Sequence, residues 1–235
     1  MTKFAVLSDM HLTFWRLTSA GAGQRKLLHG LKQSFDKEKP DAIIDAGDLE
    51  QLDLWNQAFP EYKHIHIPGN HEYYNRDWDG PEFGCRYDEV NGVRIVSATL
   101  WTNFNHDNPV AHYVVGQSMN DFRLIKNFTT TTAYEAHLYQ LEFLRKHIKN
   151  GVDIVVTHHA PSFRSAHPDY VGNPLNDGFM SDLDQFVEES KAKYWVHGHV
   201  HWQQDYMIGE TRVICNPCCY PNERSTPYLP YYIEI

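Results

Sequence analysis

Short apolar runs that end in metal-ligand side chains recur five times along this 235-residue chain. The polar clusters after these runs are Asp9-Met10-His11, Gly47-Asp48, Gly69-Asn70-His71-Glu72, His158-His159 and Gly198-His199-Val200-His201. Short runs that are apolar throughout are typical of buried parallel strands, and helical patterns separate several of them. Binding sites in open α/β sheets form at the carboxyl ends of strands. The pattern therefore predicts an α/β fold that brings the five clusters together.

The other predicted elements follow from turn residues and from the spacing of apolar positions. Strands are predicted over the apolar runs, at residues 3–8, 41–46, 64–67, 152–157 and 193–196. Helices are predicted where apolar residues recur every three or four positions, at residues 24–39, 132–149 and 180–190. Two hairpins are predicted around Asn91-Gly92 and Gly209-Glu210, with strands at residues 84–90, 93–100, 203–208 and 211–215. A last strand at residues 228–235 is expected to close a sheet edge.

Two long polar segments, residues 101–120 and 161–177, are predicted as loops. Loops of this length in compact domains are usually functional, so we expect them to set substrate specificity. No internal repeat, low-complexity tract or linker divides the sequence. The chain is therefore predicted to form a single domain of residues 1–235.

Charge and composition limit the partners of the chain. The formal net charge is -9 with neutral histidines, which argues against binding long nucleic acid, because that needs a basic surface. The N-terminus has no secretory signal pattern, and no apolar run is long enough to cross a bilayer. We therefore expect a cytoplasmic protein without a membrane partner, and its cysteines are expected to be reduced thiols. A zinc or redox pair at Cys215 and Cys218 is the less favoured interpretation.

The residue types in the five clusters indicate metal chemistry. Carboxylate and amide oxygens together with imidazole nitrogens suit Mn, Fe or Zn. Asp9 and His11 are two residues apart, as are His199 and His201, while Asp48 has two oxygens with which to bridge two ions. Two ions about 3.5–4 Å apart can clamp the attacking and leaving oxygens of a phosphoryl transfer and make hydroxide available near neutral pH. A small phosphorylated substrate is predicted, with hydrolysis of phosphate mono- or diesters as the reaction.

In this order and over residues 9–201, the clusters resemble the calcineurin-like metallophosphoesterase family. The resemblance implies a two-sheet β-sandwich flanked by helices and a dinuclear metal centre. It implies that the first ion is held by Asp9, His11 and His201, that Asp48 bridges, and that the second ion is held by Asn70, His158 and His199. His71 would contact the phosphate and protonate the leaving alkoxide as general acid.

Two adjacent histidines compete for one ligand position. His158 is preferred because it comes directly off the predicted strand, and because family members with other residues at the second position keep the first. His159 would then support the ligands or contact the substrate. Arg123 and His167 are further candidates for phosphate contact, although ordinary surface roles are favoured for both.

One position departs from the pattern of the phosphoprotein phosphatases within the family. Those enzymes carry an acid three residues after the bridging aspartate, which orients the catalytic histidine, and here that position is Gln51. The departure favours the bacterial-type branch, whose substrates are diverse. The alternative hypotheses are a nuclease or cyclic-nucleotide phosphodiesterase with the same site and, less favoured, a non-catalytic scaffold.

Overall fold

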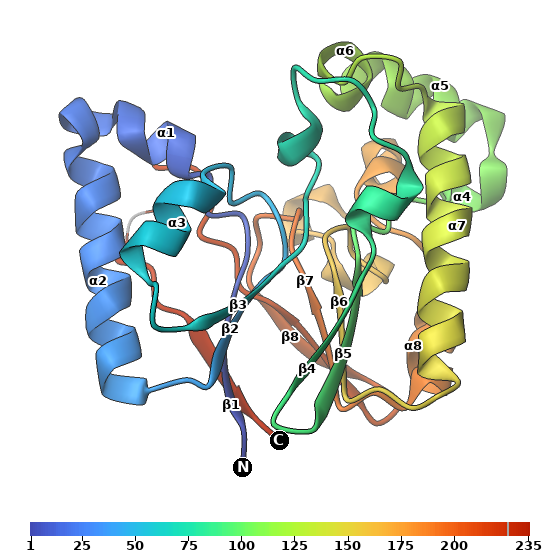
Figure 1. The fold of residues 1–235 in the computed structure, drawn as a ribbon. Helices are drawn as coiled ribbons and strands as arrows, with labels where there is room; N and C mark the ends of the chain where they lie inside the picture. The colour runs from blue at the N-terminus through green and yellow to red at the C-terminus, as the bar shows by residue number, and fades with distance from the viewer. Residues whose placement is uncertain (225) are drawn as a thin grey trace.

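Two β-sheets face each other in the computed structural model, which describes residues 1–224 and 226–235, and helices cover their outer faces (Figure 1). The first sheet has the order β10 (Tyr231–Glu234), β1 (Lys3–Leu7), β2 (Ala42–Asp45) and β3 (Lys63–His66). The second has the order β4 (Arg86–Val90), β5 (Val93–Ala98), β6 (Ile154–Thr157), β7 (Tyr194–His197), β9 (Thr211–Cys215) and β8 (Gln204–Ile208). The predicted fold class, a two-sheet α/β sandwich flanked by helices, is confirmed.

Each sheet has a parallel centre and antiparallel edges. Strands β1, β2 and β3 run parallel, as do β5, β6, β7 and β9, whereas β10, β4 and β8 are antiparallel to their neighbours. The predicted edge strand near the C-terminus is confirmed, because β10 pairs with β1. The parallel arrangement puts the carboxyl ends of β1, β2 and β3 at one edge and those of β6 and β7 at one edge of the other sheet.

The central strands are apolar on both faces because both faces are buried. Phe4 and Val6 of β1 point between the sheets and share one cluster with Ile154 and Val156 of β6. The alternate side chain Leu7 points outward, into a cluster with the helices that cover the first sheet. Side chains that alternate between two cores hold a strand in one register, because a slip by one residue would exchange its faces.

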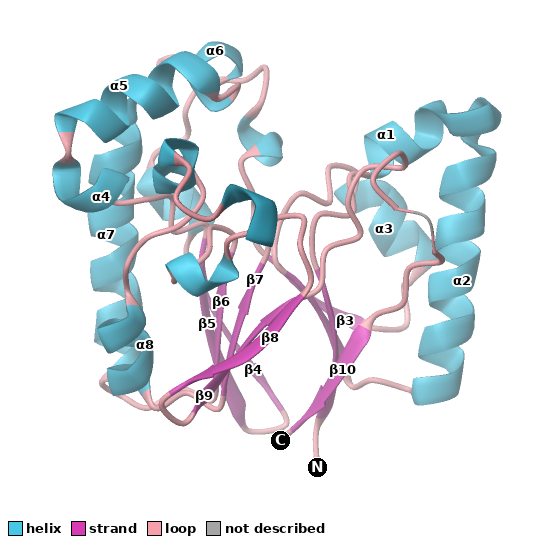
Figure 2. Ribbon diagram, turned by 180° about the vertical axis from the view of Figure 1, so that it is seen from behind, coloured by secondary structure: helices cyan, strands magenta, loops and turns pink. Residues whose placement is uncertain are grey.

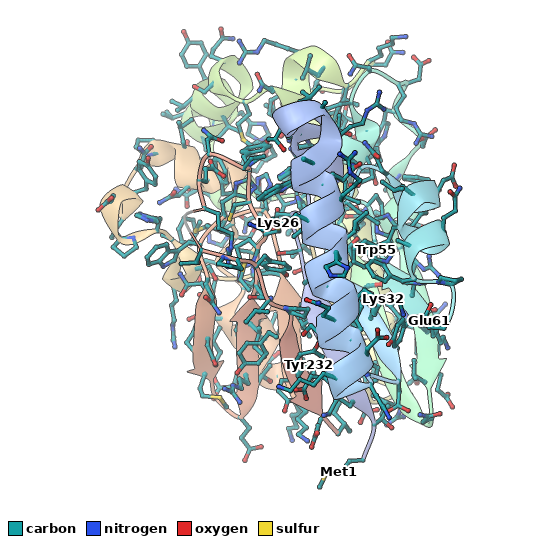
Figure 3. All side chains as sticks on the ribbon, turned by 90° about the vertical axis from the view of Figure 1, so that its left-hand side faces the viewer. Met1, Lys26, Lys32, Trp55, Glu61 and Tyr232 are labelled. Atoms are coloured by element: carbon teal, nitrogen blue, oxygen red, sulfur yellow. The ribbon has the colours of Figure 1, made fainter. Side chains whose placement is uncertain are left out.

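Helices α1 (Leu12–Leu17), α2 (Ala22–Glu38) and α3 (Leu52–Ala58) cover the outer face of the first sheet. In α2, Leu27, Leu31 and Phe35 are spaced by four residues and all are buried. Figure 3 shows α2 lying across this face, with Trp55 of α3 and Tyr232 of β10 beside it. The predicted helix at residues 24–39 matches α2 within two residues, but α1 and α3 were not predicted.

Helices α7 (Thr130–Ile148) and α8 (Asp184–Ser190) cover the outer face of the second sheet (Figure 2). The helix predicted at residues 132–149 matches α7. The helix predicted from residue 180 begins only at Asp184. Its first part is extended instead, because Met180 forms a β-bridge with Ala160 and Ser181 donates to the Ala160 carbonyl oxygen.

The prediction of a long polar loop at residues 101–120 was wrong, because this segment is mostly helical. It contains α4 (Phe104–Asp107) and α5 (Pro109–Ser118), and α6 (Asp121–Leu124) follows it. The Asn108 side chain caps α5 by accepting a hydrogen bond from the Val110 amide, and Pro109 occupies the first turn. Ala111 and Val115 then bury one face of the helix in a separate apolar cluster. By contrast, the loop predicted at residues 161–177 forms only short 3-10 turns, the last of which runs over Pro174–Gly178.

The loops that carry the polar clusters lie at one end of the sandwich, between the two groups of helices (Figure 2). Helices α4, α5 and α6 rise beside this end. The two termini lie at the other end, where β1 and β10 pair (Figure 1). Across the described part of the chain, we find no helix that combines the length and apolar character needed to span a membrane.

Candidate metal centre

Several of the predicted ligands have a left-handed backbone. The φ angles are 51° at Asp9, 43° at His11, 60° at Asp48, 67° at His199 and 42° at His201. This conformation costs a residue with a side chain about 1–2 kcal/mol. The loops are held in it by hydrogen bonds between strand ends, such as those from the Asp9 amide to the Gly47 carbonyl and from the His11 amide to the Asp48 carbonyl. The sharp turns direct successive side chains toward one point.

The first group of converging ligands is Asp9, His11 and His201. The Nε2 atoms of His11 and His201 lie 3.0 Å apart, and Nε2 of His201 lies 3.6 Å from Oδ1 of Asp9. The other ring nitrogens are already engaged, since Nδ1 of His11 contacts Glu50 at 2.7 Å and Nδ1 of His201 contacts Glu223 at 2.8 Å. Carboxylates in this position fix which imidazole nitrogen is free to bind a metal.

The second group is Asp48, His158 and His199, with Asn70 beside it. Nε2 of His158 lies 3.5 Å from Oδ2 of Asp48 and 3.0 Å from Oδ1 of Asn70. Nδ1 of His158 contacts the Ala46 carbonyl at 2.8 Å and is therefore the protonated nitrogen. Burial lowers the pKa of His158 and of His199, which keeps both in the neutral form that binds metals.

Asp48 lies between the two groups. Its Oδ2 atom is 3.8 Å from Nε2 of His11 and 3.5 Å from Nε2 of His158, so one carboxylate oxygen faces both groups. Burial, reinforced by the nearby Glu72, raises the pKa of Asp48 well above its ordinary value. A carboxylate in such a position is stabilised when cations occupy the space beside it.

The donor set fits two metal ions. Among the described residues, Oδ2 of Asp9 and Nε2 of His199 are buried without a hydrogen-bond partner. Buried polar atoms are normally paired, so an orphaned atom in each of the two ligand groups fits residues that bind cations. Nε2 of His11 and Nε2 of His201, 3.0 Å apart, are close enough for both to bind one ion at the usual distance of about 2.1 Å.

The amide of Asn70 is oriented by residues that the sequence did not indicate. Its Nδ2 donates to Oδ1 of Asp121 at 2.8 Å and to the Tyr74 hydroxyl at 3.0 Å. The Tyr74 hydroxyl itself donates to the same Asp121 oxygen at 2.7 Å. Both amide hydrogens of Asn70 are therefore used on this side, which turns its Oδ1 toward His158.

His71 is held by an acid one position before the expected one. Its Nδ1 lies 2.9 Å from Oε1 of Glu50, the oxygen that also contacts His11. Burial alone would raise the pKa of Glu50, but the hydrogen bonds from His11 and His71 outweigh burial and lower this pKa to about 2. Gln51 instead contacts Gln24 and Thr13. Glu50 therefore contacts His71 as the acid expected at residue 51 would do in a phosphoprotein phosphatase.

Glu72 connects two of the loops. Its carboxylate accepts hydrogen bonds from the backbone amides of Asp48 at 3.0 Å, Glu50 at 2.8 Å and Gly69 at 2.7 Å. A side chain at Gly69 would place its Cβ 2.2 Å from Oδ1 of Asp48, so this close approach requires glycine. One acid thus fixes the backbone on both sides of Asp48.

The three remaining candidates have different surroundings. His159 is buried, its Nδ1 contacts the Thr99 carbonyl at 3.1 Å, and its ring lies 4.3 Å from that of His199, outside both ligand groups. Arg123 donates to the Ser118 carbonyl and to Oδ1 of Asn120. His167 lines the cleft beside the metal centre, with its ring 4.3 Å from that of Trp202.

Two clefts open beside the ligands. One cleft, which we call the main cleft because four of the proposed ligands line it, has a volume of about 830 Å³. Its lining includes Asp48, Asn70, His199 and His201 together with side chains of the 161–177 loop. The second cleft, of about 1080 Å³, extends past Glu50 and Glu72 toward Phe83. The clefts share four lining residues, which are His71, Tyr74, Asn120 and Tyr220. The Tyr220 hydroxyl lies 3.2 Å from Nε2 of His71, where the clefts meet.

Comparison with known proteins agrees with this geometry. The family model described as calcineurin-like phosphoesterase matches residues 2–203. A curated relative, the uncharacterized protein L509 of Acanthamoeba polyphaga mimivirus, is 26% identical over an alignment of 273 positions, covering 97% of this chain and 95% of the relative.

Two solved structures share the fold. The phosphopantetheinyl hydrolase of Mycobacterium tuberculosis superposes with a TM-score of 0.66 at 13% identity, over 94% of this chain and 91% of that one. A dimetal phosphatase of Danio rerio superposes with a TM-score of 0.53 at 12% identity, over 91% and 86% of the two chains. Because the family model spans most of the sequence, the chain belongs to the calcineurin-like phosphoesterase family and is a metal-dependent phosphoesterase.

Proposed function

We propose that this chain hydrolyses small phosphate mono- or diesters at a dinuclear centre of Mn, Fe or Zn ions, with His71 as general acid. The seven residues proposed to hold the ions are Asp9, His11, Asp48, Asn70, His158, His199 and His201. The observation that carries the proposal is that three of these histidines have a hydrogen-bond partner at Nδ1. Because Nδ1 of His11, His158 and His201 each has a partner, the Nε2 atoms face the inside of the centre.

The bound ions would supply hydroxide near neutral pH and neutralise charge on the phosphoryl oxygens. The chain's own residues provide the geometry for this chemistry. Asp48 faces both ligand groups, which sets their spacing. Glu50 and Glu223 hold the imidazoles of His11 and His201 in one orientation. Preorganised ligands need no rearrangement before reaction.

His71 supports the departure of the alcohol. Its Nδ1 is held by Glu50, which fixes the orientation of the ring, and its Nε2 lies 4.0 Å from Oδ2 of Asp48 where the two clefts meet. A leaving oxygen bound there would take the Nε2 proton as its bond to phosphorus breaks. The ring is fixed from the other side by Tyr74, whose ring centroid lies 4.4 Å away.

The test is hydrolysis of 4-nitrophenyl phosphate and bis(4-nitrophenyl) phosphate by metal-free protein to which Mn, Fe or Zn is added back. We expect turnover of at least one ester that requires metal, with two ions bound per chain by elemental analysis. A chain that binds two ions and hydrolyses neither ester would contradict the proposed reaction. A chain that binds no ion would contradict the proposed centre itself.

A further inference from the structure

The main cleft is acidic and aromatic, and the described residues that line it include histidines but no lysine or arginine. Its polar walls carry the amides of Asn120, Asn173 and Asn176, and its flat walls carry Tyr170 and Trp202. The latter two are 58% and 39% exposed, so their rings are accessible to a ligand. Its acidic lining residues, besides Asp48, are Asp121 and Glu223.

The charge around the ligands reinforces this character. Six carboxyl groups either line the two ligand groups or contact them directly, and they belong to Asp9, Asp48, Glu50, Glu72, Asp121 and Glu223. Two divalent ions would bring four positive charges, which these carboxylates exceed. The loaded centre would thus attract a single phosphate by direct coordination without presenting a broad positive field to the rest of the substrate.

The basic side chains near the site are already engaged. Arg123 is turned back onto the Ser118 carbonyl and the Asn120 side chain. In the second cleft, Arg76 lies 2.6 Å from Asp79 and Arg86 lies 3.5 Å from Asp88. A second anionic group on a substrate in the main cleft would therefore lose its hydration without gaining a lysine or arginine partner.

We infer that the substrate is a phosphoester whose organic group is polar and uncharged, with hydrogen-bonding groups and a flat face. This inference rests on the proposed function. The three asparagines offer donors and acceptors to such a group, and the exposed rings offer stacking surfaces. Bisphosphates, nucleoside di- and triphosphates and phosphorylated carboxylic acids are disfavoured by the same charges.

The experiment compares two isosteric substrates, 4-carbamoylphenyl phosphate and 4-carboxyphenyl phosphate, together with the methyl phosphodiester of each. Each pair differs by one negative charge at nearly constant size. With Mn-loaded protein we expect kcat/KM to be at least about tenfold higher for the carbamoyl compound. Because the effect is electrostatic, the ratio should shrink severalfold when NaCl rises from about 20 mM to about 500 mM.

Matched variants locate the effect in the main cleft. Ser118 lines this cleft and is exposed, so Ser118→Lys adds a cation there, whereas Ser118→Gln adds similar bulk without charge. We expect the ratio to fall in the lysine variant and to stay at its original value in the glutamine variant. Arg123→Ala should also leave the ratio unchanged, because that guanidinium does not line the cleft.

The opposite results are equally distinct. Equal or faster hydrolysis of the carboxyl compound overturns the inference while leaving the proposed function intact. Loss of that activity in Arg76→Ala or Arg86→Ala would then place the anionic group in the second cleft. If metal-loaded protein hydrolyses none of the four esters and neither nitrophenyl ester, the proposed function fails and the inference fails with it.

Discussion

Nδ1 of His71 lies 2.9 Å from Oε1 of Glu50, and this same oxygen lies 2.7 Å from Nδ1 of the proposed ligand His11. One carboxylate therefore orients both a metal ligand and the proposed general acid. The two imidazole rings are 4.6 Å apart between centroids. We therefore expect a change in the position of Glu50 to affect both proposed roles, metal binding by His11 and proton transfer by His71.

The first prediction follows from this shared contact. Glu50→Gln should lower kcat by roughly 10- to 100-fold, less than the roughly 100- to 10,000-fold contribution of general acid catalysis, because His71 itself is retained. The loss should be larger for an alkyl phosphate ester than for a nitrophenyl ester, because nitrophenolate leaves without protonation. The measurement is kcat for both esters at saturating metal.

The neighbouring residue provides the control. Gln51 contacts Gln24 and Thr13 and does not touch His71, so Gln51→Ala should retain close to full kcat. Equal losses in the two variants would show that Glu50 does not have the specific role described here.

The two adjacent histidines give a second prediction. Nε2 of His158 faces Asp48, whereas Nδ1 of His159 contacts the Thr99 carbonyl. His158→Ala should reduce the bound metal from two ions per chain to one, and His159→Ala should retain two. Elemental analysis of desalted protein measures this, with circular dichroism to confirm folding. The reverse pattern would assign the ligand to His159.

A third prediction concerns the residue that orients Asn70. Loss of residues that orient metal ligands typically weakens metal affinity by 10- to 100-fold. Asp121→Ala should therefore weaken one of the two metal affinities by about that factor, because the Asn70 amide is released. Isothermal titration of metal-free protein with Mn would separate the two binding events.

Asp121→Asn is the conservative comparison, since its side-chain oxygen can still accept from the Asn70 amide. Affinity near that of the unmodified chain is expected. If both variants bind two ions with unchanged affinity, Asp121 does not position Asn70 for metal binding.

The fourth prediction concerns stability and pH. Asp45 and His66 are register partners on β2 and β3 with a hydrogen bond between their side chains. Burial raises the pKa of Asp45 from 3.8 to about 7. Between about pH 4 and 7 the folded chain therefore holds a proton on Asp45 that the unfolded chain has released, so stability falls as pH rises.

Urea unfolding of metal-free protein at pH 5, 6 and 7 measures this effect. Asp45→Asn keeps a hydrogen-bonding side chain but cannot titrate, so it serves as the reference for every other titrating group. Relative to this variant, the free energy of unfolding of the unmodified chain should fall by about 2–3 kcal/mol over this range. Parallel pH dependences in the two proteins would contradict the assignment to Asp45.

The sequence predicted the fold and the convergence of the ligands because both follow from strand direction. Asp9, Asp48 and His158 lie within three residues of the ends of β1, β2 and β6, and parallel strands bring their carboxyl ends together. The helix α5 was missed because its buried face is made by Ala111 and Val115 alone, within a polar segment. Its cap residue Asn108, followed by proline, was the signal that predicts its start.

The residues that orient the ligands were less predictable. Glu223 lies 22 positions after His201, and Asp121 lies 51 positions after Asn70, on a short helix beside the centre. No periodicity or strand end links such residues to their partners, because loop geometry decides the contact. Glu50 was closest to prediction, since an acid was expected one residue later.

The backbone is left-handed at Asp9, His11, Asp48, His199 and His201. At these positions, selection for the stability of the metal-free chain and selection for metal binding favour different residues. Glycine adopts this conformation without steric cost, so at each of these positions it relieves backbone strain in the metal-free chain. The same substitution removes a side chain proposed to bind metal. A library of variants screened for heat resistance alone would thus become enriched in glycine at these positions. The selected variants would be more thermostable and inactive. Screening in the presence of limiting metal would reverse that drift, because bound ions make the strained side chains the stabilising choice.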